Sequence, residues 1–203
     1  MANKKISVIL FDLDGVLVDA CDWHYHSLND ALEYYCKIKI TYKEHIEKFN
    51  GLPTATKLNI LQIEENLQQK IWKMKQKKTL KNIMKYGQID PYKVRMLKRL
   101  KNDGFKLGCV TNSIRKTAFE MLKITGQYEF FDHVITNEDV LNNKPKPDCY
   151  LLAFNKFEVN KDEVIIVEDS PKGKEAAHAS GAQVLEVLDI YGVTYDYIRS
   201  KIL

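Results

Sequence analysis

The chain has 203 residues, of which 45% are hydrophobic and 29% charged, and its formal net charge is +4. This length and apolar content exclude a disordered chain and are sufficient for a hydrophobic core without disulfides. The mild positive charge does not by itself indicate nucleic-acid binding, and no apolar run is long enough to span a membrane.

The four cysteines have neither CxxC nor another metal-binding spacing, and Cys109 falls in a predicted buried strand. Reduced thiols in a cytoplasmic protein are the simplest interpretation. The N-terminal residues lead directly into the first predicted strand, without the apolar segment of a secretory signal peptide. We therefore expect a cytoplasmic protein that acts as a monomer or weak homodimer, with neither membrane nor nucleic acid as a partner.

The first predicted strand, residues 6–11, is an apolar run that ends in Asp12-Leu13-Asp14. Buried parallel strands have this pattern, and ligands of open α/β sheets bind beyond the carboxyl ends of strands. Because positions i and i+2 point to the same side, Asp12 and Asp14 can face one small volume. Two carboxylates so close repel each other, which favours a bound cation between them. Mg²⁺ prefers such oxygen ligands and commonly binds together with substrate phosphate. The alternative is a solvated turn whose aspartates cap the next helix.

Residues 17–89 have a helical pattern almost throughout, without the alternation of strands. Because this would be an unusually long connection, we interpret it as a helical domain inserted into a core of residues 1–16 and 90–203. It contains a basic stretch, Lys70, Lys73, Lys75, Lys77, Lys78, Lys81 and Lys85. We interpret the stretch as a solvated helix face, with steering of anionic substrates as the functional alternative. Ile71 and Trp72 within it are interpreted as packing residues.

From about residue 90 onward, strand and helix patterns alternate, which predicts βαβ units and a parallel sheet. Further strands are expected at residues 106–110, 133–136, 164–167 and 183–187. The second strand ends in Thr111-Asn112-Ser113, which can cradle a phosphate at a helix start or simply cap that helix.

Two more polar segments follow in the same half of the chain. Lys144 lies in the turn Asn143-Lys144-Pro145-Lys146-Pro147, where it can neutralise phosphate and carboxylates or remain a solvated lysine. Glu168-Asp169 ends the fourth strand. Because neighbouring strand residues point in opposite directions, we expect only one of these two acids to contact a metal directly. We expect Asp169 to be that ligand and Glu168 to act through a water molecule or by holding the ligands in place. The alternative is that both acids cap the following helix.

In this order, Asp12-Leu13-Asp14, Thr111-Asn112-Ser113, Lys144-Pro145 and Glu168-Asp169 resemble the four motifs of the haloacid dehalogenase-like (HAD) superfamily. The chain looks like the subgroup that contains β-phosphoglucomutase and phosphoglycolate phosphatase. The resemblance implies an α/β fold, with a Rossmann-like parallel sheet and an inserted α-helical cap that closes over the site.

The resemblance also assigns roles. Asp12 would be the nucleophile that forms an aspartyl-phosphate, and Asp14 would be the general acid and base. Thr111, the Asn112 amide and Lys144 would hold the phosphoryl group. Mg²⁺ would be bound by Asp12, the Asp14 backbone carbonyl and Asp169. His24 matches a histidine that couples cap closure to acid–base chemistry in β-phosphoglucomutase-like members, or it lies at the cap–core boundary without a chemical role.

Two observations bear on the reaction. Dehalogenases of the superfamily lack an acid two residues after the first aspartate, so Asp14 favours phosphate esters, whose alkoxide leaves more easily with a proton. Residues 50–58 resemble the cap substrate loop, but Thr54 stands where β-phosphoglucomutases place an arginine, and nearby Lys57 is no bidentate clamp. We expect a phosphatase of a small phosphorylated metabolite, with a phosphomutase and a catalytically silent binding protein as alternatives.

Overall fold

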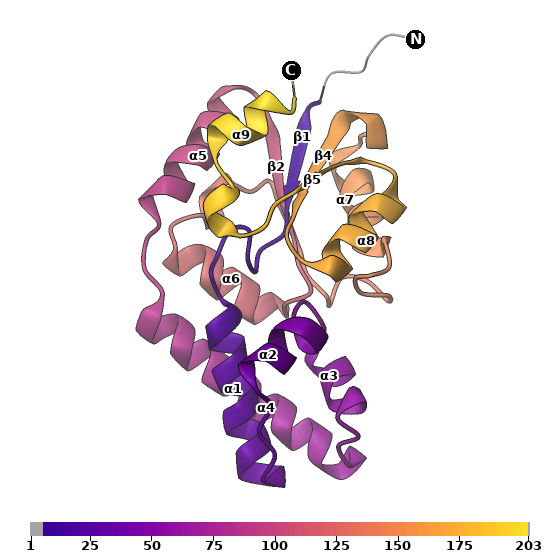
Figure 1. The fold of residues 1–203 in the computed structure, drawn as a ribbon. Coiled ribbons are helices and arrows are strands. Elements are labelled where there is room, and N and C mark those ends of the chain that lie inside the picture. Colours follow the sequence, from indigo (N-terminus) through magenta and orange to yellow (C-terminus); the bar gives the residue numbers. More distant parts are fainter. Residues whose placement is uncertain (1–5, 203) are drawn as a thin grey trace.

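The computed structural model describes residues 6–202, and its centre is a parallel sheet of five strands in the order β3-β2-β1-β4-β5 (Figure 1). The strands are β1 (Val8–Phe11), β2 (Lys106–Val110), β3 (His133–Ile135), β4 (Val164–Glu168) and β5 (Gln183–Glu186). Every predicted strand is present. The bounds of β2 are as predicted, and the other strands differ from prediction by one or two residues at one end, because strand ends follow the ladder hydrogen bonds and not the apolar run.

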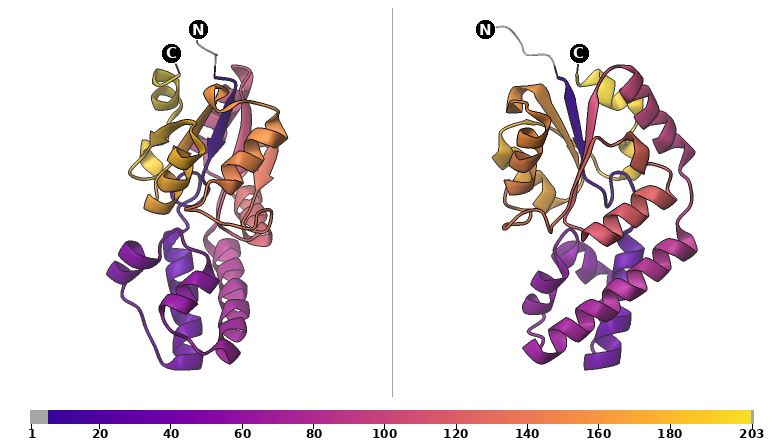
Figure 2. Two further views of the ribbon diagram at one scale, coloured as in Figure 1. Left: turned by 90° about the vertical axis from the view of Figure 1, so that its right-hand side faces the viewer. Right: turned by 180° about the vertical axis from the view of Figure 1, so that it is seen from behind.

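Helices cover both faces of the sheet (Figures 1 and 2). They are α5 (Pro91–Asn102), α6 (Arg115–Ile124), α7 (Asp148–Phe157), α8 (Pro171–Ser180) and α9 (Tyr195–Ser200). Short 3₁₀ turns lie at Tyr128–Phe130, Lys161–Glu163 and Ile190–Gly192. Helix α7 begins directly after Pro147 and α8 begins at Pro171, since proline fits the start of a helix.

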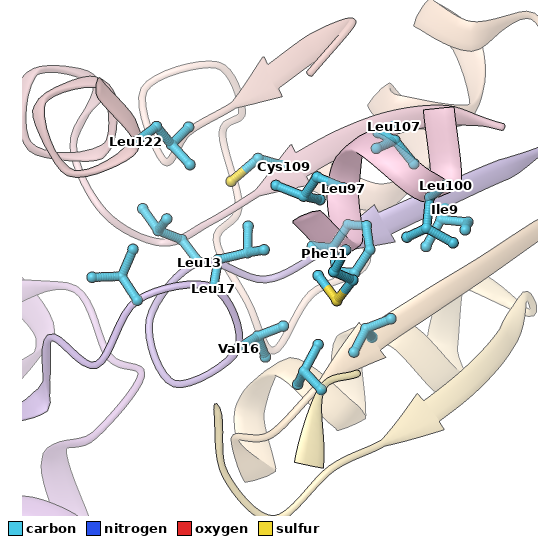
Figure 3. Packing of buried hydrophobic residues seen from close by; sticks show 14 of the residues in the cluster. Ile9, Phe11, Leu13, Val16, Leu17, Leu97, Leu100, Leu107, Cys109 and Leu122 are labelled. Atoms are coloured by element: carbon cyan, nitrogen blue, oxygen red, sulfur yellow. The ribbon is translucent and has the colours of Figure 1, made fainter. Parts of the chain in front are cut away.

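Alternate residues of β1 enter two different hydrophobic clusters. Ile9 and Phe11 pack with Leu97 of α5 on one face, as Figure 3 shows, whereas Val8 and Leu10 pack with α7 and α8 on the other. Each of these β1 side chains is fully buried. The continuous apolar run of β1 is therefore explained by a strand that is covered on both faces.

The helical cap is inserted between β1 and α5. It consists of α1 (Cys21–Cys36), α2 (Tyr42–Glu44), a π-helix at His45–Phe49, α3 (Thr54–Ile60) and α4 (Glu65–Tyr86). The cap lies beyond the carboxyl ends of the strands, and α1 and α4 pack along each other (Figure 1). Its own apolar core includes Leu28, Leu32 and Ile71. The predicted α/β fold with a parallel sheet and an inserted helical cap is confirmed.

The chain returns from the cap to the core at residues 87–90. Asp90 caps α5 by accepting hydrogen bonds from the backbone N–H groups of Tyr92 and Lys93, and Pro91 occupies the first helical position. Within the described residues, no helix is long and apolar enough to cross a membrane.

Replacing Leu97 by alanine tests the packing of α5 on the sheet. Leu97 is fully buried, so Leu97→Ala is expected to lower the free energy of unfolding by about 2–5 kcal/mol. Leu141 is 98% exposed, and the same substitution there is expected to change stability by less than about 0.5 kcal/mol. Urea unfolding followed by circular dichroism measures both, and equal effects would contradict the packing described here.

Candidate active site

Polar residues from four segments meet at the carboxyl edge of the sheet. Asp12 follows β1, Thr111 follows β2, and Glu168 ends β4. Because β1 lies between β2 and β4 in the sheet, these strand ends are neighbours. The loop between β3 and α7 adds Lys144. The residues that the sequence placed at separate strand ends are thus brought into one site, as expected for a parallel sheet.

Lys144 is the centre of the site. Its side chain is 3% exposed, and its ammonium donates to Asp12 Oδ1 at 2.7 Å, Glu168 Oε1 at 2.6 Å and the Val110 carbonyl at 2.8 Å. All three N–H bonds of the ammonium are therefore used. Although burial lowers the pKa of Lys144, the two carboxylates outweigh burial and raise it well above its usual value. Lys144 is a buried, permanently charged group and not a solvated turn lysine.

Glu168 is held behind Asp12 by three partners. It is fully buried, and its Oε1 accepts from the Tyr150 hydroxyl at 2.6 Å as well as from Lys144. The Ser170 hydroxyl donates to Oε2 at 3.4 Å. Gly173 of α8 makes room for this carboxylate, because a Cβ atom at that position would overlap it.

Asp12, Glu168 and Asp169 form a cluster that could bind a metal ion. Each offers one carboxylate oxygen, and these oxygens lie within 4.8 Å of one another. Strand β4 ends at Glu168, so Asp169 lies beyond the strand and is not restricted to the opposite direction. Within residues 6–202, Asp169 Oδ1 is buried and has no hydrogen-bond partner. Hard oxygen donors with an unsatisfied buried atom fit a hard divalent cation such as Mg²⁺.

Burial and mutual repulsion shift the acidity of this cluster. Burial raises the pKa of Asp12 well above its usual value, although Lys144 opposes the shift. Burial and the neighbouring Glu168 raise the pKa of Asp169 to about 7. Gly15, with a φ of +90°, leaves the space that the Asp169 carboxylate occupies, since a Cβ atom there would overlap it. A side chain at position 15 would thus disturb both the backbone and the acidic cluster.

Asp14 has a different environment from Asp12. Its Oδ1 accepts from His24 Nε2 at 2.8 Å, and its Oδ2 accepts from the Ser113 hydroxyl at 2.9 Å. Burial opposes ionisation, but His24 and Ser113 outweigh it and lower the pKa of Asp14 to about 2. Both carboxylate oxygens of Asp14 have these partners, and the metal-binding cluster consists of Asp12, Glu168 and Asp169, so a metal contact through the Asp14 backbone carbonyl stays a prediction.

His24 connects Asp14 to the cap. Lys75 of α4 lies 3.0 Å from His24 Nδ1, on the opposite side of the ring from Asp14. Burial and Lys75 lower the pKa of His24, so the ring is neutral at neutral pH. A neutral ring that accepts from the lysine must carry its proton on Nε2, where it donates to Asp14. His24 is thus the middle of a relay that runs from the core to the cap.

Thr111 and Asn112 hold the loops around the site. The Thr111 hydroxyl accepts from the Ser113 N–H at 2.9 Å and lies 3.4 Å from Asp14 Oδ2. The Asn112 side chain donates to the Gly51 and Lys144 carbonyls at 2.8 and 3.2 Å and accepts from the Lys144 N–H at 3.1 Å. Its amide group therefore joins the cap loop to the core, and its backbone N–H is the group left for the predicted phosphate contact.

Two buried lysines of the cap were not predicted. Lys75 and Lys57 are 5% and 6% exposed, and both line a cavity of about 200 Å³ between cap and core. The interpretation of the basic stretch as a solvated face is wrong for Lys75. The spacing of Lys75 in the sequence is consistent with its burial, because Ile71, Lys75 and Thr79 are four residues apart and lie along the buried side of α4. Trp72, predicted to pack, is 37% exposed and borders the same cavity.

The chain belongs to the haloacid dehalogenase-like hydrolase family, whose sequence profile matches residues 9–187. This match covers both the strand-end acids and the cap, and it confirms the predicted family and the predicted class of enzyme, a hydrolase.

Several known proteins are similar over nearly the whole chain. The pyrophosphatase PpaX of Bacillus velezensis is 30% identical over 190 residues, which cover 92% of this chain and 85% of that protein. The phosphorylated carbohydrates phosphatase of Thermotoga maritima is 28% identical over 206 residues, covering 98% and 90%. The crystal structure of β-phosphoglucomutase from Clostridium difficile has a TM-score of 0.83 at 22% identity and covers 97% of both chains, so it shares the fold.

Removing the central cation tests the buried ion cluster. Lys144→Met leaves Asp12 and Glu168 without a counter-charge and is expected to lower the free energy of unfolding by about 3–5 kcal/mol. The double variant Lys144→Met/Glu168→Gln removes one of the two carboxylate charges and is expected to recover part of the loss. Lys116, exposed on α6, provides the control Lys116→Met. Urea unfolding in buffer without divalent cations measures all three, and an unchanged stability of Lys144→Met would contradict the cluster.

Proposed function

We propose that this protein is a Mg²⁺-dependent phosphomonoester hydrolase that acts on a small phosphorylated metabolite through an aspartyl-phosphate intermediate. The observation that carries the proposal is the environment of Asp12. This buried carboxylate is ion-paired with Lys144 and belongs to the oxygen cluster that fits a divalent cation. A carboxylate, a fixed cation and a metal-binding cluster are the groups that phosphoryl transfer requires.

Asp12 is the proposed nucleophile. Its ion pair with Lys144 fixes one oxygen, which leaves the other to attack phosphorus. Asp12 and Asp169, with the predicted Asp14 backbone carbonyl, would hold Mg²⁺, which when bound supplies positive charge against the phosphate oxygens. Thr111 and the Asn112 N–H are the proposed donors to the phosphate. Lys144, whose three N–H bonds have protein acceptors in the free protein, is proposed to bind the phosphate through its positive charge beside Asp12.

Asp14 is the proposed general acid and base. Its carboxylate is ionised in the free protein, and a phosphate bound beside it adds negative charge that favours the protonated form. In that form Asp14 can protonate the leaving alkoxide, and afterwards it can take a proton from the attacking water. His24 orients Asp14 through the hydrogen bond to Oδ1 and links this step to the position of the cap.

The relatives support phosphate compounds as substrates, since they are named as a pyrophosphatase and a phosphatase of phosphorylated carbohydrates. The phosphatase is favoured over a phosphomutase because no arginine lines the cavity among the described residues and Thr54 lies at its cap side. A silent binding protein is disfavoured because Asp12, Asp14, Lys144 and Asp169 are all present.

Phosphate release from a panel of sugar phosphates, phosphoglycolate, pyrophosphate and nucleotides tests the proposal. We expect release from a few compounds with Mg²⁺ and none after chelation, and we expect Asp12→Asn to abolish release while urea unfolding still shows a folded protein. Asp162→Asn, at an exposed position, is the matched control. Conversion of β-glucose 1-phosphate to the 6-phosphate without phosphate release would instead establish the phosphomutase.

Comparing substrates whose leaving groups differ in their need for a proton tests the role of Asp14. For alkyl phosphates, whose leaving alkoxide needs a proton, Asp14→Asn is expected to lower turnover by about 10²–10⁴-fold. For p-nitrophenyl phosphate, whose leaving group is stable as an anion, the first burst of nitrophenol is expected to decrease much less. Rapid-quench and absorbance measurements give both values. Equal losses with the two kinds of substrate would show that Asp14 is not the acid.

A further inference from the structure

Lys57 is a buried cation without a partner. It lies on α3 of the cap, its residue is 6% exposed, and it lines the cavity between cap and core. Within residues 6–202 its ammonium has neither a hydrogen bond nor an ion pair. Buried charged groups in proteins are normally paired, because removing an ammonium from water without compensation costs several kcal/mol.

The surrounding groups do not supply the missing negative charge. Among the described residues that line the cavity, Asp14 is the one acid. Its charge favours the protonated form of Lys57 and raises the pKa of that ammonium against burial, but its oxygens are bonded to His24 and Ser113 and not to Lys57. Burial raises the pKa of the nearby Cys21 thiol, so no thiolate is available at neutral pH. Lys75, the second buried lysine of the cavity, contacts a neutral imidazole, and burial and Lys57 lower its pKa to about 7, so it carries part of a positive charge at neutral pH. The cap side of the cavity therefore has an excess of positive charge.

Lys57 remains a cation despite this cost. Burial lowers its pKa to about 8, which still leaves the ammonium predominantly protonated at neutral pH. His45, the ring in the π-helix, cannot compensate it, because burial and the lysine lower the pKa of His45 to about 3 and keep that ring neutral. A charge that is retained in the cavity without a protein partner is available to an anionic ligand.

The cavity is small. Its volume of about 200 Å³ is below the range of about 300–1,000 Å³ that is typical of pockets for drug-sized ligands. With the cap closed as in this structure, contacts across the cap–core boundary limit its size, because Asn112 binds the Gly51 carbonyl at 2.8 Å and Thr117 lies 3.4 Å from Gln76. A ligand that fills it must be compact.

We propose, building on the phosphatase function above, that the substrate is a compact phosphate compound with a second anionic group, either a carboxylate or a second phosphate, and that Lys57 binds this group from the cap. Asp12 would react with one end of such a substrate while Lys57 fixes the other. The lysine thereby selects the substrate by its second charge, and an ester without that charge leaves the ammonium unpaired.

The test compares three compact compounds: 2-phosphoglycolate, with a carboxylate; pyrophosphate, with a second phosphate; and ethyl phosphate, with neither. We expect the wild type to prefer at least one of the first two in kcat/KM. Lys57→Met should lower kcat/KM for the preferred compound by about 30-fold or more and leave ethyl phosphate nearly unchanged. Lys77→Met, on the exposed side of α4, is the matched control. A loss confined to phosphoglycolate identifies a carboxylate, and a loss confined to pyrophosphate a second phosphate.

A binding measurement separates this proposal from folding and from catalysis. Lys57→Met should melt no lower than the wild type, because it replaces an unpaired buried charge by an apolar group of similar size. In an Asp12→Asn background, the preferred compound should raise the Tm, and adding Lys57→Met should remove most of that shift.

Two outcomes would overturn the proposal in distinguishable ways. If the wild type hydrolyses ethyl phosphate as well as the two compounds that carry a second anionic group, or if Lys57→Met affects all three equally, the role of Lys57 is wrong and the phosphatase stands. If the wild type releases phosphate from no compound with Mg²⁺ present, the phosphatase function itself fails, and this inference fails with it.

Discussion

The buried ammonium of Lys144 is the interaction on which the site depends. It lies between two carboxylates from neighbouring strands, and its third hydrogen bond goes to the end of β2. An ammonium in this position attaches the long loop between β3 and α7 to the three central strands. The same charge allows Asp12 to be buried and close to Glu168, which would otherwise be too repulsive. The site is therefore arranged before a substrate binds, as electrostatic catalysis requires.

The cap contributes to this arrangement through polar contacts with the core. Asp14, His24 and Lys75 form a hydrogen-bonded chain from β1 into α4, and Asn112 binds the cap loop at Gly51. A cap that moved away would break these contacts and expose Asp14 to water. The proposed proton transfer by Asp14 would thereby be linked to a closed cap, in which water is excluded and charges interact more strongly.

Much of the core and of its acidic residues could be predicted from the sequence. Three apolar runs end in Asp12, Thr111 and Glu168, and a parallel sheet brings these residues together, because the carboxyl ends of its strands meet at one edge. Lys57 and Lys75 could not be identified in this way. A lysine on an amphipathic helix is buried or solvated according to how the helix rotates against its neighbours. Lysines occur on several sides of α4, so composition does not separate Lys75 from the others, and the spacing of Ile71, Lys75 and Thr79 shows its burial only once the buried side is known. The side-chain bonds of Asn112 likewise depend on how the cap docks, which no local pattern specifies.

Asp12, and not another acid of the cluster, is the residue that we propose becomes phosphorylated. Quenching the enzyme during turnover and reducing it with borohydride converts an aspartyl-phosphate to homoserine, which peptide mass spectrometry can locate. We expect homoserine at position 12 that depends on both substrate and Mg²⁺. Homoserine at position 14 or 169, or no modified aspartate under conditions in which phosphate is released, would contradict this proposal.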